Sequence, residues 1–236
     1  MTQPRAILLD FYGTVVEEDE APVTLVCKEI FKAPSNAKNL DELTSYWWRT
    51  FFDLYPESYG DTFRYEKELG YEALQKTMSQ FNVNLDSEKL KQALSEYWDK
   101  YWGKPAIFPE SREVLEKLTK LKIPICLVSN IDNDVLNSAL SYNQLSFDFI
   151  VTSEDCKSYK PRPEMFDKAL SLLNLSNNEV LHVGDSLNSD VRGANNMNIP
   201  VLWINRKKRD ISSRSEKPDY ISTTLTGIFD IIGQPD

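Results

Sequence analysis

Four side chains suited to phosphoryl transfer stand at widely separated points of the chain. Asp10 supplies a carboxylate that could attack phosphorus, and Thr14 and Ser129 supply hydroxyl donors. Lys160 adds an ammonium group for the nonbridging oxygens. Phosphoryl transfer needs a positioned nucleophile among donors and cations, because the charge on the transferred group is stabilised electrostatically. We therefore predict that these four residues are catalytic.

Acidic residues of the same set predict a divalent metal site. Asp10, Asp185 and the main-chain carbonyl of Tyr12 offer hard oxygen ligands, and Asp190 either joins them or holds a metal-bound water. Two unit charges about 5 Å apart repel by about 3 kcal/mol at an effective dielectric of about 20, so one carboxylate would protonate without a cation. A protonated Asp10 would be a poor nucleophile. Oxygen-only ligands favour Mg²⁺ over zinc or copper.

Short apolar runs precede these residues and predict a parallel sheet. Strands are expected at 6–9, 123–128, 147–151, 180–183 and 201–204, with 220–221 at an edge, and helices near 110–121, 133–142, 163–173 and 189–197. This alternation is typical of a doubly wound α/β domain, in which ligands bind beyond the carboxyl ends of the strands. Asp10, Ser129 and Asp185 lie at or just beyond three of these strand ends, so one site is expected to collect them.

The segment between the first two strands predicts a separate helical module. Most of the tryptophans lie in it, and Leu90, Leu94 and Trp98 recur at helical spacing after Asp86 or Ser87, either of which could cap the helix. We predict a helical insert at residues 17–105 and an α/β core at residues 1–16 and 106–236.

Composition limits the partners. The chain has 236 residues and a formal net charge of -9, which disfavours nucleic acid and anionic membranes as partners. No apolar run in the sequence reads as a signal peptide or a membrane span. Cys27, Cys126 and Cys156 are odd in number and widely spaced, which argues against a disulfide framework. We expect a cytoplasmic protein acting on a small molecule, with its oligomeric state open.

Taken in order, four short motifs resemble those of the haloacid dehalogenase (HAD) superfamily. They are Asp10-x-Tyr12-Gly13-Thr14, Ser129-Asn130, Lys160-Pro161, and Gly184-Asp185 followed by Asp190. The resemblance spans most of the chain and implies an α/β core with an α-helical cap. It also implies that Asp10 is a nucleophile that forms a covalent aspartyl intermediate. We predict Tyr12, Gly13 and Asn130 as substrate or phosphate contacts, with capping of the next helix as the alternative role of Asn130.

Tyr12 departs from the pattern of most phosphatases of that superfamily. They carry a second aspartate there, which acts as general acid to the leaving alcohol. A tyrosine is typical of the superfamily's L-2-haloacid dehalogenases, which displace halide from carbon without a metal. Their fourth motif, however, has Ser and Asn where this chain has Asp185 and Leu187. We favour a Mg²⁺-dependent phosphatase of a small phosphorylated metabolite; the alternatives are a metal-free L-2-haloacid dehalogenase and a non-catalytic phosphate-binding protein.

Two other features are interpreted structurally. His182 lies inside a predicted apolar strand and is expected to be a packed core residue. The basic run Arg206-Lys207-Lys208-Arg209 follows a predicted strand and is expected to be a solvated loop rather than a substrate contact.

Overall fold

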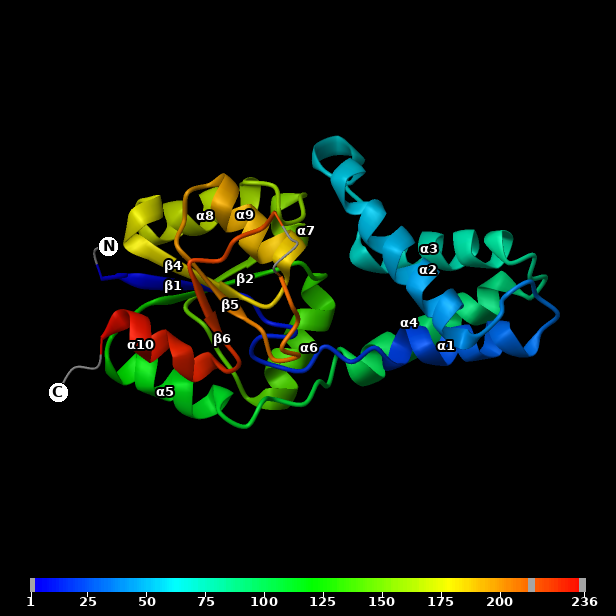
Figure 1. Cartoon of the computed structure of the whole chain (residues 1–236), viewed down its shortest axis with the longest axis horizontal. Coiled ribbons are helices and arrows are strands. Elements are labelled where there is room, and N and C mark those ends of the chain that lie inside the picture. Colours follow the sequence, from blue (N-terminus) through cyan, green and yellow to red (C-terminus); the bar gives the residue numbers. More distant parts are fainter. Residues whose placement is uncertain (1–2, 212–214, 234–236) are drawn as a thin grey trace. The chain divides into compact units, whose positions relative to one another are not determined.

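The computed structural model of this chain describes residues 3–211 and 215–233. The chain divides into two compact units. The first comprises Met1–Glu17, Ala106–Asn130 and Leu145–Asp236, and the second comprises Glu18–Pro105 and Ile131–Gln144. The first holds a sheet with its covering helices, and the second is helical (Figure 1). They are called the α/β unit and the helical unit below.

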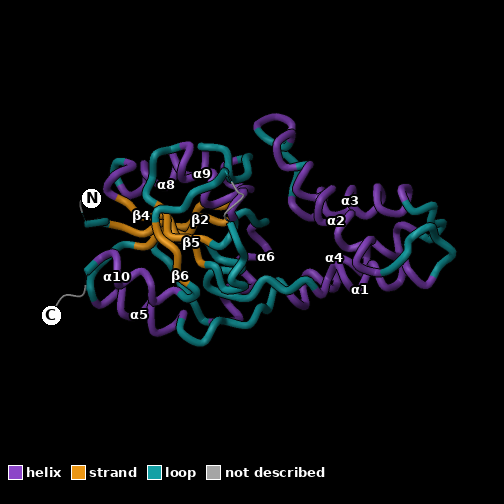
Figure 2. The backbone as a smooth tube through the Cα atoms, in the orientation of Figure 1, coloured by secondary structure: helices purple, strands orange, loops and turns teal. Residues whose placement is uncertain are grey.

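A six-stranded parallel sheet forms the centre of the α/β unit (Figure 2). Its strands are β1 (Ala6–Leu9), β2 (Ile125–Ser129), β3 (Phe149–Thr152), β4 (Val180–Gly184), β5 (Val201–Ile204) and β6 (Tyr220–Ser222). Their order is β3-β2-β1-β4-β5-β6, and every pairing is parallel. The doubly wound α/β fold expected from the sequence is confirmed, with β6 at an edge. Because the strand order reverses beside β1, the carboxyl end of β1 is where such a sheet binds its ligand.

Helices cover both faces of this sheet, which explains why its central strands are mostly apolar. They are α5 (Ser111–Lys120), α7 (Ser153–Cys156), α8 (Glu164–Leu173), α9 (Arg192–Asn196) and α10 (Ile228–Ile232), with short turns η3 (Asn177–Glu179) and η5 (Leu225–Gly227). In Figure 1, α8 and α9 lie over one face, and α5 and α10 over the other. Every residue of β1 is fully buried. The helix expected at 189–197 is divided into a π-helical segment, η4 (Leu187–Val191), and α9.

Aromatic packing forms the core of the helical unit. Its main helices are α1 (Ala21–Lys32), α2 (Leu40–Asp53), α3 (Glu66–Gln80), α4 (Ser87–Tyr101) and α6 (Asn133–Asn143), with turns η1 (Tyr55–Glu57) and η2 (Gly60–Thr62). The rings of Trp47 and Phe51 stack with centroids 4.8 Å apart, and Trp98 lies 6.4 Å from Trp47. A Cβ at Gly70 would lie 2.0 Å from the Trp98 ring, so α3 packs closely on that side chain. The Asp86 side chain caps α4.

Residues 131–144, which carry α6, belong to the helical unit. The Asp132 carboxylate accepts hydrogen bonds from the main-chain N–H groups of Glu66, at 2.8 Å, and Lys67, at 3.0 Å, at the start of α3. The Lys67 ammonium also lies 2.8 Å from Asp134. The sequence-based division left this segment in the α/β core. A helix cap from so distant a residue leaves no local pattern to read.

None of the helices in the described ranges is long and apolar enough to cross a membrane. The three cysteines are free. Burial raises the pKa of the Cys27 and Cys126 thiols to about 12 and that of Cys156 to about 11. These thiols are therefore protonated at neutral pH and poor nucleophiles.

Candidate active site

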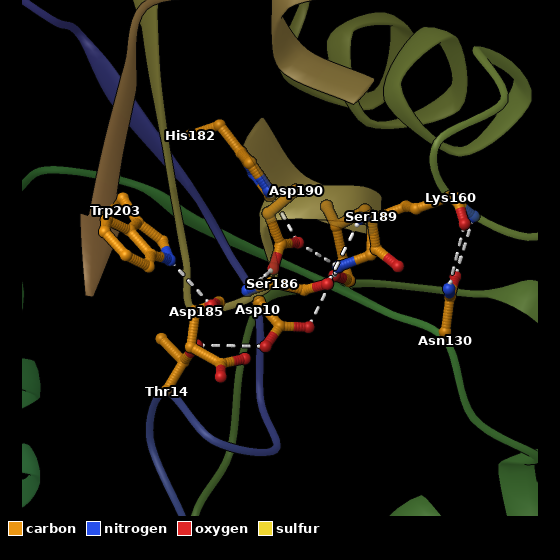
Figure 3. A network of polar contacts seen from close by, with 11 residues as sticks. Asp10, Thr14, Asn130, Lys160, His182, Asp185, Ser186, Ser189, Asp190 and Trp203 are labelled. Carbon is orange, nitrogen blue, oxygen red and sulfur yellow. Dashed lines mark hydrogen bonds and ion pairs between the residues drawn. The ribbon is translucent and has the colours of Figure 1, made fainter. Parts of the chain in front are cut away.

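Several of the predicted residues lie together at the carboxyl edge of the sheet, and Figure 3 shows Asp10, Thr14, Lys160, Asp185 and Asp190 among them. Asp10 directly follows β1, and its main-chain N–H donates to Val183 of β4 at 2.9 Å. Ser129 is the last residue of β2 and is buried. Asp185 directly follows β4. Parallel strands end at one edge of a sheet, so residues far apart in sequence meet there.

Lys160 connects two of the carboxylates. Its Nζ lies 2.9 Å from Asp10 Oδ1, 2.7 Å from Asp190 Oδ1 and 2.7 Å from the Val128 carbonyl oxygen. Its side chain is 1% exposed. The three acceptors saturate the three N–H donors of the ammonium group. Lys160 is therefore held as a buried cation between the predicted nucleophile and a predicted metal ligand.

Asn130 holds the main chain of Lys160. Its Oδ1 accepts from the Lys160 N–H at 2.8 Å, and its Nδ2 donates to the Lys160 carbonyl at 3.2 Å. Both ends of the amide are thus engaged with the loop that presents the lysine, as Figure 3 shows. This pairing gives Asn130 a positioning role; its role as a substrate or phosphate contact stays a prediction.

Burial and neighbouring charge shift the pKa values of this cluster in different directions. Burial raises the pKa of Asp10; the Lys160 ammonium opposes the rise and the Asp190 charge adds to it. For Lys160, burial disfavours the ammonium, but Asp10 and Asp190 outweigh it and raise the pKa. Burial acts against the Asp190 carboxylate too, yet Lys160 and the hydrogen bond from His182 leave its pKa well below the ordinary value. A further cation beside Asp10 would favour its ionised form.

Asp190 is fixed by the turn that carries it. The π-helical segment η4 returns its Oδ2 to the Ser186 N–H, 2.9 Å away. His182 Nε2 lies 3.0 Å from Oδ1, while His182 Nδ1 has no hydrogen-bond partner within the described ranges. A Cβ at Gly184 would come within 2.3 Å of the Asp190 carboxyl carbon. Only glycine leaves room for this carboxylate beneath the end of β4.

Gly13 makes the corresponding space for Asp185. Its φ is +75°, a conformation that glycine adopts without strain, and a Cβ there would lie 2.6 Å from the Asp185 carboxyl carbon. The Asp185 carboxylate therefore lies against the loop after β1. The predicted phosphate contact of Gly13 stays a prediction, whereas its close approach to Asp185 is a feature of the structure.

Asp10, Asp185 and Asp190 fit a divalent cation. One carboxylate oxygen from each lies within 4.8 Å of the other two. Mg²⁺ holds its oxygen ligands at about 2.0–2.1 Å, so the ligand oxygens of one octahedral ion are about 3 Å apart when adjacent and about 4 Å apart when opposite. Oxygens within 4.8 Å of one another need only a small side-chain adjustment to share one ion. The all-oxygen donor set suits Mg²⁺. The additional ligand expected from the Tyr12 carbonyl stays a prediction.

Thr14, Tyr12 and Ser129 complete the predicted set. Thr14 is buried, and its Oγ1 donates to Asp10 Oδ2 at 3.0 Å. The Tyr12 ring meets the Phe11 ring edge to face, with centroids 5.1 Å apart. Asp10 is thus held at one oxygen by Thr14 and at the other by Lys160, which leaves the carboxylate oriented by donors on two sides.

The interpretation of the basic run as a solvated loop is wrong for Arg206, whose side chain is 18% exposed, whereas Arg209 is exposed but also makes a main-chain contact. Arg206 Nη2 donates to the Thr14 carbonyl at 2.8 Å, and its Nη1 lies 2.8 Å from Glu110. Arg209 Nη2 donates to the Asp185 carbonyl at 2.6 Å. Lys207 and Lys208 between them are exposed, as expected. The run follows β5, so the strand-end rule applied to that strand would have pointed to it.

The prediction that His182 is a packed core residue is confirmed, but the side chain also has a polar partner. It is fully buried, as a core residue would be, and its ring meets Phe166 edge to face. Its contact with Asp190 joins it to the polar cluster. Its place within an apolar strand gave no sign of this, because the partner comes from the following turn.

Comparison with known proteins identifies a family. The sequence profile of haloacid dehalogenase-like hydrolases matches residues 4–198. A ribulose-1,5-bisphosphate 5-phosphatase from Halopiger xanaduensis is 25% identical over 145 residues, which cover 58% of this chain and 61% of that protein. An (S)-2-haloacid dehalogenase 4A from Burkholderia cepacia is 26% identical over 211 residues, 86% of this chain and 84% of that one. A crystal structure of an L-2-haloacid dehalogenase has a TM-score of 0.79 at 20% identity, covering 98% of this chain and 99% of its own.

Proposed function

Because this chain belongs to the haloacid dehalogenase-like hydrolases, we propose that it is a Mg²⁺-dependent phosphatase that acts on a small phosphorylated metabolite through an aspartyl phosphate on Asp10. The observation that carries the proposal is the proximity of Asp10, Asp185 and Asp190, which each have a carboxylate oxygen within 4.8 Å of the other two. Three carboxylates so close together are stable in ionised form only when cations balance them. A cytoplasmic location is part of the same proposal.

Asp10 is oriented for attack by its own neighbours. In the proposed reaction a carboxylate oxygen of Asp10 bonds to phosphorus while the bond to the leaving oxygen breaks. Water then attacks the aspartyl phosphate, which releases inorganic phosphate and restores the carboxylate. Thr14 and Lys160 fix the carboxylate from opposite oxygens. Mg²⁺ held by Asp10, Asp185 and Asp190 would neutralise charge on the phosphoryl group.

Tyr12 limits the substrates of this reaction. An alkoxide leaving group needs a proton, and loss of a general acid costs about 10²–10⁴ in rate. The aryloxide and carboxylate groups of aryl and acyl phosphates leave more readily without a proton, so we expect these phosphates to be better substrates than alkyl phosphates. Tyr12→Asp should raise alkyl-phosphate turnover more than aryl-phosphate turnover. Unchanged or lower alkyl-phosphate turnover in the folded variant would refute this account of Tyr12.

A metal-free L-2-haloacid dehalogenase is the second candidate. Lys160 already neutralises Asp10 and Asp190 in part, and Arg209 Nη2 lies 3.7 Å from Asp185 Oδ2. The repulsion that the sequence suggested as an argument against metal-free chemistry is therefore weakened. Tyr12, and the dehalogenase similarity over most of the chain, also favour this candidate. Asp185 remains the residue that argues for the phosphatase, because it completes the carboxylate trio.

One assay separates the two candidates. Purified protein is tested on an aryl phosphate and on a 2-haloacid, each with Mg²⁺ and with chelator. Mg²⁺-dependent phosphate release that Asp10→Asn abolishes supports the phosphatase, and chelator-insensitive halide release supports the dehalogenase. Asp167→Asn is the matched control, because Asp167 is an exposed carboxylate of the same unit. A chain that releases neither product from a broad panel would contradict both.

A further inference from the structure

Arg209 is held against the metal-site loop on two sides. Its Nη2 donates to the main-chain carbonyl of Asp185 at 2.6 Å, and its guanidinium lies 5.3 Å from the centre of the Trp203 ring. Trp203 Nε1 donates to the same carbonyl at 2.7 Å, a contact drawn in Figure 3. Arg209 therefore occupies a defined place at the end of β5, although its side chain is 44% exposed.

The same guanidinium is a charge partner of the Asp185 carboxylate. Arg209 Nη2 lies 3.7 Å from Asp185 Oδ2, too far for a good hydrogen bond and close enough for an ion pair. The other two members of the carboxylate trio, Asp10 and Asp190, share Lys160. Each carboxylate of the trio thus has a cationic partner supplied by the chain itself. Lys160 is buried and central, whereas Arg209 stands at the exposed side.

We propose that Arg209 is a resident counter-ion of Asp185 that competes with the divalent cation and so sets the affinity of the carboxylate trio for it. This proposal rests on the proposed function, since it assumes the metal site. The Arg209 guanidinium and a divalent cation beside the same Asp185 carboxylate repel each other, so each lowers the affinity of that carboxylate for the other. The half-exposed arginine offsets part of the negative charge of the three carboxylates. The same positive charge weakens the binding of a metal ion.

A purely positioning role of Arg209 predicts the opposite change in Mg²⁺ affinity when the arginine is replaced. If Arg209 mattered only by fixing the Asp185 loop, its loss would weaken metal binding. The Trp203 indole remains as a donor to the Asp185 carbonyl when Arg209 is replaced, so the loop keeps one of these two anchors. The electrostatic term is therefore expected to exceed the positioning term, and the direction of the change decides between them.

The test measures Mg²⁺ affinity rather than turnover. Thermal unfolding of the full chain, stripped of metal with chelator and dialysed, is followed against Mg²⁺ concentration at constant ionic strength. R209Q and R209M remove the charge in two ways, and R209K keeps it. We expect about three- to tenfold tighter Mg²⁺ binding in R209Q and R209M, allowing for screening at a half-exposed site, and a change below about twofold in R209K.

K208Q is the matched control. It removes the same charge from the same loop, and Lys208 is exposed. Its Mg²⁺ affinity should stay within about twofold of the wild type, because the charge of an exposed side chain is screened by salt. Melting temperatures without Mg²⁺ report whether each variant is folded.

The outcomes separate the two levels of the argument. Tighter binding in both neutral variants, with wild-type affinity in R209K and K208Q, supports the counter-ion. Mg²⁺ binding that is unchanged or weaker in the neutral variants overturns it and leaves the phosphatase intact. Equal tightening in K208Q also overturns it, because the effect would then be one of net charge. A wild-type chain with no response to Mg²⁺ overturns the metal site, the proposed phosphatase and the counter-ion together.

Discussion

The polar cluster at the strand ends and the aromatic core of the helical unit are both buried, yet they are stabilised by different forces. Asp10, Lys160 and Asp190 are buried charged side chains, and Lys160 balances the charge of both carboxylates. Trp47 and Trp98 bury large apolar rings whose contribution grows with the area removed from water. Buried charges contribute little net stability but are costly to separate. We therefore expect substitutions in the polar cluster to affect turnover as well as stability, and substitutions in the aromatic core to affect mainly stability.

The largest expected effect comes from removing the shared cation. Lys160→Met leaves Asp10 and Asp190 without their common partner, so metal-free protein should lose about 3–5 kcal/mol of unfolding free energy. Turnover should fall by about 10²–10³. Urea unfolding in chelator and aryl-phosphate assays measure the two effects. Lys168→Met is the control, because that side chain is 41% exposed. A Lys160→Met protein as stable as the wild type would contradict the claim that the buried carboxylates of the polar cluster need their shared cation.

Truncation in the aromatic core should change stability without the same direct loss of chemistry. Trp98→Ala removes a ring that is 1% exposed and should cost about 3–5 kcal/mol of unfolding free energy. Phe52→Ala, at a ring 46% exposed on α2, should cost less than about 1 kcal/mol. Circular dichroism during urea unfolding compares them. Equal losses in the two variants would contradict the packing account of this core.

A smaller and pH-dependent effect is expected at Asp190. Its folded pKa is lowered, so its ionisation stabilises the protein above its ordinary pKa of 3.8, and this contribution is lost as pH falls through the lowered value. Asp190→Asn should therefore cost about 1–3 kcal/mol at pH 7 in chelator, and less near pH 3. Urea unfolding across this range measures the difference, with the exposed Asp230→Asn as control. A pH-independent difference would rule out the ionic contribution.

The smallest effect is expected at His182, where the two kinds of burial meet. His182→Phe removes the donor to Asp190 Oδ1 but also removes the buried, unpaired Nδ1. These changes oppose each other, so unfolding free energy should change by less than about 1 kcal/mol. Turnover should fall by about tenfold or less, since Lys160 and Ser186 still hold Asp190. A loss above about 3 kcal/mol would show that the histidine carries the cluster.

Sequence reasoning located what short-range pattern encodes. The apolar runs gave the strands to within two residues, and Asp10, Ser129 and Asp185 lie at the carboxyl ends of β1, β2 and β4, as the strand-end rule predicted. It missed the contact of Arg206 with Thr14, whose partners lie far apart in the chain, and that of His182 with Asp190, whose partner lies in the turn after the strand. These depend on side-chain direction at the ends of the strands, which neither hydrophobic period nor motif order specifies.

The assignment of α6 failed for a related reason. Its amphipathic pattern is that of any helix covering a sheet, and Asp132 and Asp134 are among the residues that join it to the helical unit. Charged residues near a helix start are common, so they indicate no particular partner. Long-range capping is visible only when the fold is known.

The inclusion of α6 in the helical unit has a consequence for protein engineering. The chain enters that unit twice, through Glu18–Pro105 and again through Ile131–Gln144. In a chimera that exchanges only the longer piece with a related enzyme, α3 would come from one protein and the residue at position 132 from the other. The contacts that the Asp132 carboxylate makes with the first turn of α3 would then no longer be inherited together. The helical unit can therefore be transplanted intact only if both pieces are moved together, and a recombination library cut at a single pair of crossover points would separate α3 from Asp132.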